Sequence, residues 1–451
     1  MPVNIPSSHN AEQIGEAARP KFWQPQWLNR DLALLFAGRG LRSLAQGYLT
    51  IIVPLYLAQL GYDAFQLGLL FTASAVASAA LTAAVGFLSD RFGRRSLLIV
   101  ISLLMTGGGI FFAISGNFIV LVLAAALGTI GRGGGAGSGG AWGPYYPAEQ
   151  ALIAEHASDA QRTTIFGALS FIGVLTGALG SLLAILPGIL HSSFSLSQIS
   201  GYRILFILTA FLGIAMALVV LPVREHAGAP RVKTSAKSGQ ERVRLSQKTW
   251  GLIWRFMITN ATNGLAIGML GSFIVYWFYR RYGVDANVLG GLFFIINLAA
   301  AVPYLLAGRL ARKLGAVNTV VVTRVVAVIL LAVMAVMPTF LLAAILYLVR
   351  MIAITLSNPV RQSYLMGVIS PDERARAAGL ANLPSQVAAA ISPGIAGYII
   401  QSVSLDLPLE LAALFQAVNT ILYFWFFRNV HPPEERQSTQ KTESKPHAAE
   451  I

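Results

Sequence analysis

The sequence contains no cysteine and few charged residues, and both shortages limit what the protein does. Without cysteine, disulfide bonds and thiolate chemistry are excluded. Charged residues make up 12% of the chain, whereas soluble proteins carry about a quarter. The six histidines are scattered along the chain, which argues against a metal cluster. We therefore predict no metal site and no cofactor.

Sequence motifs of common enzyme classes are also missing. The chain has no H-E-x-x-H zinc motif, no G-x-S-x-G nucleophile motif and no G-x-x-x-x-G-K-[ST] phosphate loop. The stretch GRGGGAGSGG (131–140) contains a formal G-x-G-x-x-G, but a dinucleotide loop follows a strand, and this stretch follows a long apolar run. We predict that the protein is not an enzyme and does not use ATP by itself.

Hydrophobic residues, by contrast, make up 55% of the chain and occur in long runs. About 20 apolar residues in a helix cross the hydrocarbon core of a bilayer. The runs predict an all-α polytopic membrane protein with twelve spans. With boundaries good to a few residues, these are 31–59, 65–88, 95–115, 118–152, 163–188, 202–222, 251–279, 286–308, 315–337, 340–368, 375–402 and 407–427.

The loops between the predicted spans alternate between basic and uncharged. Lys and Arg gather in DRFGRR, in residues 223–250, in GRLARK, in SPDERAR and in the C-terminal tail, whereas loops such as SGN carry none. Because cytosolic loops of membrane proteins are rich in Lys and Arg, we predict a multi-pass protein of the plasma (inner) membrane with both termini cytoplasmic. Arg280 and Arg281 are the exception. The net charge of +14 then needs no nucleic acid as a partner.

An internal repeat divides the spans into two halves. GYDAFQLGLLF begins at Gly61 and GVDANVLGGLF at Gly283, and Gly86 and Gly308 begin a second matching pair with the same spacing of 222 residues. Same-direction halves typify transporters that rock around a site at the membrane midplane. We predict a cytoplasmic segment 1–30, a six-helix half 31–222, a basic linker 223–250, a six-helix half 251–428 and a cytoplasmic tail 429–451.

Two aspartates hold matching positions in this repeat. Asp63 and Asp285 each precede a predicted span, where an aspartate side chain accepts hydrogen bonds from the first N–H groups of a helix. Gln66 follows Asp63 at the spacing of a capping box. We predict that both aspartates are N-caps, with a structural role.

The loop between the second and third predicted spans carries the clearest motif. Its sequence, GFLSDRFGRR from Gly86 to Arg95, resembles the G-x-L-x-D-R-x-G-R-R signature of the major facilitator superfamily (MFS). Together with the twelve spans, the central basic loop and a degenerate second copy, the resemblance covers about residues 30–430. It implies an MFS fold of two pseudo-symmetric six-helix bundles. The stretch PAEQALIAE (147–155) is similar to the end of the fourth helix in the drug and metabolite exporter branches.

The resemblance also implies a gating motif, which in the family latches the cytoplasmic side and breaks when the halves rock. Gly93 would make the tight turn, Asp90 would pair with Arg94, and Glu155 would join them. The full set is Gly86, Asp90, Arg91, Gly93, Arg94, Arg95 and Glu155. The alternative is that this loop only orients the protein in the membrane. The second copy has Arg312 where the first has Asp90.

Polar side chains within the predicted spans are candidates for a substrate site, because such residues are costly in a membrane. In the superfamily, helices one, four, seven and ten line the central cavity. The candidates from these helices are Arg42, Gln46, Arg132, Asn260, Asn263 and Arg350. Arg39 and Arg361 are expected to reach the interface, and Arg324 to bind carbonyl groups between helices nine and ten. An arginine-rich cavity favours an anionic or amphiphilic substrate.

Glu149 is the one acidic residue well placed within a predicted span. Proton coupling requires a carboxyl group that gains and loses a proton inside the membrane, so Glu149 is the candidate for this role. The alternative is a structural ion pair with Arg94 or another cytoplasmic arginine.

These observations predict a secondary transporter that moves a small molecule by alternating access, with proton-coupled efflux favoured. One alternative is a proton-coupled importer of an organic anion or metabolite. Another is a sensor or scaffold that keeps the fold without transporting. The expected partners are the substrate, protons and the lipid bilayer, with no nucleic acid, and the protein is expected to be a monomer.

The glycine-rich stretch fits this reading as an insertion in one half. A single helix over residues 118–155 would be far longer than the ~30 Å hydrocarbon core, and glycine is a poor helix former. We predict that the fourth span is interrupted or bulged within Gly133–Gly143, beside the cavity.

Overall fold

The computed structural model describes residues 28–128, 130, 143–156, 162–225, 246–369 and 373–430. Within these ranges, the side chains of a few helical residues, Gly86 and Asp90 among them, also lie outside the description. The described residues form helices and turns without a strand, as the all-α prediction requires.

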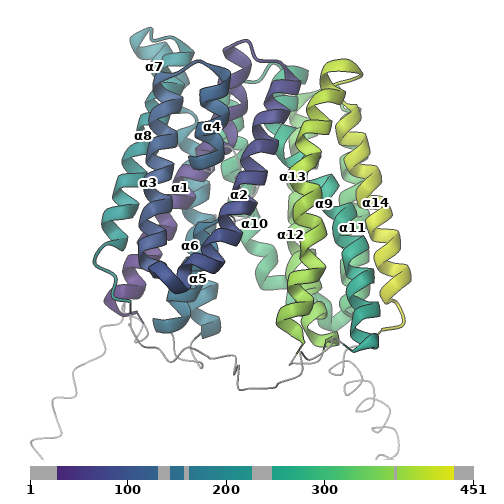
Figure 1. The fold of residues 1–451 in the computed structure, drawn as a ribbon. Helices are drawn as coiled ribbons and strands as arrows, with labels where there is room; N and C mark the ends of the chain where they lie inside the picture. Colours follow the sequence, from purple (N-terminus) through teal and green to yellow (C-terminus); the bar gives the residue numbers. More distant parts are fainter. Residues whose placement is uncertain are drawn as a thin grey trace, which may run out of the picture.

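Fourteen helices make up the described part of the chain, and they form two groups (Figure 1). The first group is α1 (Arg30–Gln59), α2 (Ala64–Phe92), α3 (Arg94–Ile114), α4 (Phe118–Gly128), α5 (Tyr145–His156), α6 (Arg162–Leu183), α7 (Leu186–Phe194) and α8 (Gln198–Val220). The second group is α9 (Gln247–Tyr282), α10 (Ala286–Leu314), α11 (Ala316–Ala335), α12 (Phe340–Val368), α13 (Arg374–Ser402) and α14 (Leu407–Phe427).

Ten stretches of the described chain are helical, long and apolar enough to cross a membrane, which confirms the polytopic prediction. α10 adds an eleventh, bent by 56° between Ala286–Ala301 and Leu306–Leu314. Pro303 lies at this bend, where its ring and missing N–H disrupt the helix.

The predicted fourth span, 118–152, is not one continuous helix, because α4 ends at Gly128 and a separate helix, α5, begins at Tyr145. This agrees with the interruption predicted for the span. Gly143, just before α5, has φ of +80°, which no continuous α-helix allows. The rest of the predicted interruption, residues 133–142, lies outside the described residues. The stretch after residue 188, where the fifth predicted span ends, is also partly helical, since α7 continues to Phe194.

We call the end of the bundle where α1 begins and α14 ends the base, and the opposite end the top; the base is at the bottom of Figure 1. Glycines at equivalent turns show that the sequence repeat is also a backbone repeat. At the base, Gly93 has φ 82° and ψ 149°, and Gly315 has φ 80° and ψ 156°. At the top, Gly61 and Gly283 have φ of 88° and 66°.

The two predicted aspartate caps differ. Asp63 forms the expected capping box with Gln66, with both hydrogen bonds present. Asp285 has nearly the same backbone angles, but its side chain accepts no capping hydrogen bond. The prediction for Asp285 is therefore wrong. The third residue after it is Val288, whose side chain has no group to complete the box.

Close contacts join the two groups in the top half of the molecule. A Cβ added to Gly68 of α2 would lie 3.1 Å from Cα of Gly397 of α13, so these two helices touch backbone to backbone. Asn297 of α10 donates a hydrogen bond of 3.1 Å to the Ser181 hydroxyl of α6. Both contacts lie in the halves of their helices that lead to the top turns, and they hold the groups together there.

Candidate functional site

A buried ion pair joins α1 to α5. Nε of Arg39 donates to Oε1 of Glu149 at 3.1 Å, and Nη2 of Arg39 also bonds the second carboxylate oxygen. The two side chains are 2% and 0% exposed. Arg39 lies nine residues into α1, about 14 Å from its base end at 1.5 Å per residue. The expectation that Arg39 reaches the interface is wrong, because Glu149 provides a partner inside the bundle.

The turn before α5 brings aromatic rings to the same place. Gly143 and Pro144 precede the helix, so Tyr145 and Tyr146 lie in its first turn. The guanidinium of Arg39 lies 5.1 Å from the centre of the Tyr146 ring, and that of Arg42 lies 5.0 Å from the Tyr145 ring. A cation over the face of an aromatic ring is attracted by the ring's quadrupole. α5 therefore supplies one carboxylate and two rings to the arginines of α1.

Glycine is required at position 143 for space as well as for backbone conformation. A Cβ there would lie 3.0 Å from Nη2 of Arg42, in addition to the strain of a positive φ. The glycine-rich stretch thus ends directly against the arginine face of α1.

The remaining cavity candidates of the first group have different outcomes. Arg42 and Gln46 are both buried, 5% and 7% exposed, on the same face of α1 as Arg39. Oε1 of Gln46 is buried without a hydrogen-bond partner. Arg132 lies outside the described residues.

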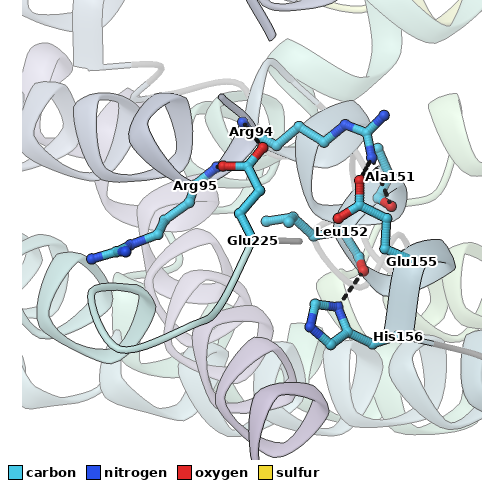
Figure 2. A network of polar contacts seen from close by, with 7 residues as sticks. All are labelled: Arg94, Arg95, Ala151, Leu152, Glu155, His156 and Glu225. Atoms are coloured by element: carbon cyan, nitrogen blue, oxygen red, sulfur yellow. Dashed lines mark hydrogen bonds and ion pairs between the residues drawn. The ribbon is translucent and has the colours of Figure 1, made fainter. Parts of the chain in front are cut away.

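The predicted gating motif is visible in part at the base (Figure 2). Nη1 of Arg94 bonds the carboxylate of Glu155, and it also donates to the carbonyl of Ala151 at 3.4 Å. This pair links the start of α3 to the end of α5. The side chain of Asp90 lies outside the description, so its predicted contact with Arg94 stays a prediction. Arg91 is exposed at the end of α2.

A second carboxylate, Glu225, occupies the same base and was not predicted. It accepts hydrogen bonds from the backbone N–H groups of Arg94 at 2.8 Å and Arg95 at 3.4 Å (Figure 2). An acidic group at a helix N-terminus is stabilised by the free N–H groups and by the helix dipole. A Cβ on Gly93 would lie 2.7 Å from Oε2 of Glu225, so the glycine turn makes room for this cap. In the sequence, the one sign of this contact is that Glu225 is an acidic residue at the start of a basic linker.

A buried carboxylate also holds a helix start at the base of the second group. Glu373, which precedes α13, accepts from the backbone N–H of Ser246 at 2.8 Å and from the Thr249 hydroxyl. Ser246 is the N-cap of α9. Glu373 thus fixes the start of α9, as Glu225 fixes that of α3.

Arg324 lies in a network of amides inside the second group. Its Nη1 donates to Oδ1 of Asn263 on α9 at 3.1 Å and to Oδ1 of Asn419 on α14. Asn419 in turn donates to the carbonyl of Thr259 on α9. Arg324 was expected to bind backbone carbonyls between the ninth and tenth predicted spans, which are α11 and α12. This is wrong, because its partners are side chains of α9 and α14. The network ties α9, α11 and α14 together.

Arg350 lies on α12, in contact with α14. Its Nη2 donates to Oε1 of Gln416 at 3.3 Å, and its guanidinium lies 5.9 Å from the centre of the Tyr347 ring. Arg350 is 3% exposed, and its Nε is buried without a hydrogen-bond partner. Asn260 donates to the carbonyl of Ala381 on α13 at 2.7 Å, which gives it a helix-joining contact.

A cavity of about 670 Å³ lies at the top of the second group. It is lined by Tyr276, Tyr279, Arg280, Gly283, Asp285, Ile400, Gln401 and Leu405. The neighbouring Arg281 instead pairs with Asp406 at 3.2 Å, and Trp277 donates to the same carboxylate at 2.7 Å. Arg280 and Arg281, which were the exception to the charge pattern of the loops, thus have different roles. Arg281 fixes the start of α14, and Arg280 lines the cavity.

Comparison with known sequences identifies the family. The sequence model of the Major Facilitator Superfamily matches residues 35–358 and 256–449. The chain belongs to the Major Facilitator Superfamily. It is therefore a membrane transporter by family, not an enzyme, and its substrate is a small molecule.

Two curated relatives illustrate its sequence neighbourhood. The uncharacterized membrane protein YJR124C of Saccharomyces cerevisiae is 23% identical over 402 residues, which are 82% of this chain and 88% of the yeast protein. The quinolone resistance protein NorA of Staphylococcus aureus is 27% identical over 263 residues, 57% of this chain and 60% of NorA. The name of the second relative states quinolone resistance.

Solved structures share the fold. The nucleoside transporter NupG has a TM-score of 0.70 at 15% identity, covering 88% of this chain and 100% of NupG. A bacterial homologue of the human lysosomal transporter Spinster, in an inward-facing and unoccupied conformation, has a TM-score of 0.67 at 16% identity, covering 89% and 97%. At these identities the likeness establishes the MFS fold and carries no substrate.

Proposed function

We propose that the protein is a proton-coupled exporter that works by alternating access, with Glu149 as its protonation site. The observation that carries the proposal is the Arg39–Glu149 ion pair, fully enclosed in the bundle. A buried ionisable residue in a membrane span is costly, which makes it a candidate for function. Glu149 is also the only carboxylate in the described part of the first group that is buried at this depth.

The arrangement gives protonation a mechanical consequence. In the present state, one carboxylate faces the charges of both Arg39 and Arg42. When Glu149 takes up a proton, the carboxylate charge is lost and the two guanidinium groups repel each other at close range. Desolvated charges interact more strongly than charges in water. Because both arginines lie on α1 and Glu149 lies on α5, protonation would remove the charge attraction that holds α5 against α1. A change in the packing of these helices would accompany a change in which end is open.

The base latch and the top contacts suggest which state is present. The two groups are joined near the top by α2 with α13 and by α6 with α10. In the proposal, the base faces the cytoplasm of the plasma membrane, because the basic loops lie there, and the state is open to the cytoplasm. The Arg94–Glu155 pair lies within the first group, so it does not join the two groups at the base in this state. In the proposal, the rest of the motif, with Asp90 as its expected third member, engages when the base closes. The transporter would act as a monomer, since one chain supplies both groups.

Export is favoured over import by the sequence likeness to NorA, whose name states quinolone resistance. Import by the same site, driven by the same proton movement, is the alternative outcome. A sensor that binds its ligand without moving it is the third.

The test uses the full chain in proteoliposomes that contain a pH-sensitive dye. A quinolone is added as the probe, and proton movement on its addition is measured in the wild type, in Glu149→Gln and in Glu410→Gln. Glu410 is an exposed carboxylate in the first turn of α14 and serves as the matched control. We expect probe-driven proton movement in the wild type and in Glu410→Gln, and none in Glu149→Gln. Undiminished coupling in Glu149→Gln would remove Glu149 from this role.

The direction is measured in the same vesicles. With the interior acidic, an exporter present with its base outward accumulates the probe, whereas an importer in that orientation releases it. Probe binding without any accumulation or release would support the sensor.

A further inference from the structure

The second group contains positive charges at membrane depth that its own spans cannot neutralise. Between Gln247 and Phe427, the helical segments contain a single acidic residue, Glu410, and it lies exposed at the top. Arg324 lies about 12 Å from the base end of α11 and Arg350 about 15 Å from the top end of α12, at 1.5 Å per residue. Both arginines are therefore well inside the bundle, away from any carboxylate of these helices.

The partners of these arginines are neutral. Arg324 bonds two asparagine oxygens, and Arg350 bonds one glutamine oxygen at 3.3 Å and the Met351 sulfur at 3.7 Å. Buried charges in proteins are normally paired with an opposite charge or a metal. No ion pair in the described part of the second group involves either arginine. The excess of buried positive charge is therefore a property of the second group as a whole.

The two arginines differ in how completely their hydrogen bonds are used. Arg324 bridges Asn263 and Asn419, whose other atoms continue the network to α9, so its contacts join three helices. Arg350 has one hydrogen bond of 3.3 Å to the Gln416 oxygen and one of 3.7 Å to the Met351 sulfur, both to its own helix or to one neighbour. Nε of each arginine is buried without a hydrogen-bond partner. A guanidinium has five N–H donors in a planar fork, which matches the two oxygens of a carboxylate or phosphate. Arg350 has this fork largely unused.

The surroundings of Arg350 increase its preference for an anion. Gln416 and Asn419 are three residues apart on α14 and so share one face of the helix. Arg350 and Arg324 therefore bond side chains that lie one turn apart on α14. Next to Arg350, the Tyr347 ring offers an apolar and aromatic surface, and it is itself packed against Phe278 and Phe293.

We propose that Arg350 binds the anionic group of the transported substrate, which is an amphiphilic organic anion such as an aromatic carboxylate. The two oxygens of the anionic group accept hydrogen bonds from Nε and an Nη of Arg350, and the apolar part of the molecule contacts Tyr347. Arg324 acts through the amide network that holds α14. This assignment rests on the proposed function, because it names the substrate class of that transporter.

The division of labour between the groups follows. In the proposal, the first group contains the proton-accepting carboxylate of Glu149 with its partner Arg39. The second group contains Arg350, whose anionic partner is the substrate. An incoming organic anion would neutralise the second group as Glu149 neutralises Arg39 in the first.

The test measures binding in detergent, without a membrane gradient. Benzoate, benzamide and benzylamine are the probes, matched in size and differing in charge, at constant ionic strength. Thermal unfolding of the full chain gives the apparent affinity, since a ligand that binds only the folded state stabilises it in proportion to the logarithm of its concentration over Kd. We expect benzoate to raise the unfolding temperature of the wild type, with little effect of the amide and the amine.

The variants assign the effect to a residue. Arg350→Gln should weaken benzoate binding at least about tenfold, the usual effect of losing a charged hydrogen-bond partner. Arg350→Lys keeps the charge without the planar fork and should lie between the wild type and Arg350→Gln, which separates binding from misfolding. Arg280→Gln is the control, because Arg280 lines the top cavity, a different place where an anion would meet an arginine. It should bind benzoate as the wild type does.

The results that would overturn the proposal are distinct. They are no stabilisation of the wild type by benzoate, equal stabilisation by benzamide, equal stabilisation by inorganic phosphate or chloride, or full benzoate binding in Arg350→Gln. Loss of binding in Arg280→Gln alone would move the site to the top cavity. The two proposals are tested by separate readouts. Benzoate binding is measured in detergent without a proton gradient, and proton movement is measured in proteoliposomes, so failure of one proposal leaves the other measurable.

Discussion

The two groups of helices bury arginine in opposite ways. In the first, Arg39 meets the carboxylate of Glu149, and α1 and α5 are joined by opposite charges. In the second, the contacts of Arg324 and Arg350 with described residues are to amide oxygens, a methionine sulfur and an aromatic ring. The backbones repeat closely, as Gly93 and Gly315 show, so the difference lies in side chains. One backbone repeat thus supports a closed charge pair in one half and an open cation in the other.

This contrast teaches how a two-fold fold acquires asymmetric function. A transporter that couples two ions or molecules needs two sites that respond differently, and a duplicated bundle begins with two equal ones. Here the acidic residue is present in only one copy at membrane depth. The following predictions test the contrast, from the largest expected effect to the smallest.

Replacing Glu149 by leucine should have the largest effect, because it leaves Arg39 and Arg42 buried without their shared carboxylate. We expect a loss of about 3–5 kcal/mol in the free energy of unfolding, the range found when one partner of a buried pair is removed. The double variant Arg39→Leu with Glu149→Leu should recover part of the loss, because Arg39 is removed together with its carboxylate and Arg42 alone is left without it. Unfolding of purified protein in micelles measures both, and equal losses in the two variants would contradict the ion-pair account.

Replacing Asn419 by leucine tests the amide network of the second group. The change removes an acceptor from Arg324 and a donor to the Thr259 carbonyl. Hydrogen bonds to charged groups contribute about 1.5–3 kcal/mol, and we expect a loss in this range. The same unfolding assay applies, with Asn260→Leu as a comparison that leaves Arg324 untouched. A loss at Asn419 no larger than that expected for an exposed site would show that Arg324 does not depend on its amides.

Alanine at Gly93 and at Gly315 compares the two base turns. Both glycines have φ near +80° with extended ψ, a region nearly restricted to glycine, so each substitution should cost about 1–3 kcal/mol. Gly93→Ala should cost more, because the new Cβ also displaces the Glu225 carboxylate. Unfolding free energies of the two variants, each measured against the wild type, provide the comparison. A smaller loss at Gly93 than at Gly315 would argue against the Glu225 cap.

The smallest effect is expected at the top caps. Asp63→Ala removes a capping box and should cost about 1 kcal/mol. Asp285→Ala removes no capping hydrogen bond and should change stability by less than about 0.5 kcal/mol. Thermal unfolding of the two variants side by side decides this, and equal losses would mean that Asp285 caps its helix in solution.

Much of the fold was predictable from the sequence, because membrane spans are set by apolar length and the repeat by matching glycines. The ends of the fourth span were not, since a glycine-rich stretch in a membrane protein is compatible both with close helix packing and with a break. The positive φ of Gly143 shows that the helix is broken at that residue.

The candidate site was predictable in its residue types and much less in its pairs. Arg39 appeared close enough to a helix end to reach water, and only the position of α5 against α1 shows that Glu149 meets it instead. Glu225 gave almost no signal, because a carboxylate that caps a helix 130 residues away is linked to it by tertiary structure alone. Partners far apart in the sequence require the fold, and residue types do not.

The carboxylate caps at the base have a further consequence for how the chain is assembled. Glu225 belongs to the first group and holds the start of α3, whereas Glu373 belongs to the second and holds Ser246 at the start of α9. Each group therefore contains its own carboxylate that holds a helix start, one before and one after residues 226–245. If the chain were cut within those residues, the Glu225 cap of α3 would stay in the first fragment, and the Glu373 contact with the start of α9 would stay in the second. Co-expressed fragments are thus a practical way to exchange one half of the transporter while keeping the other.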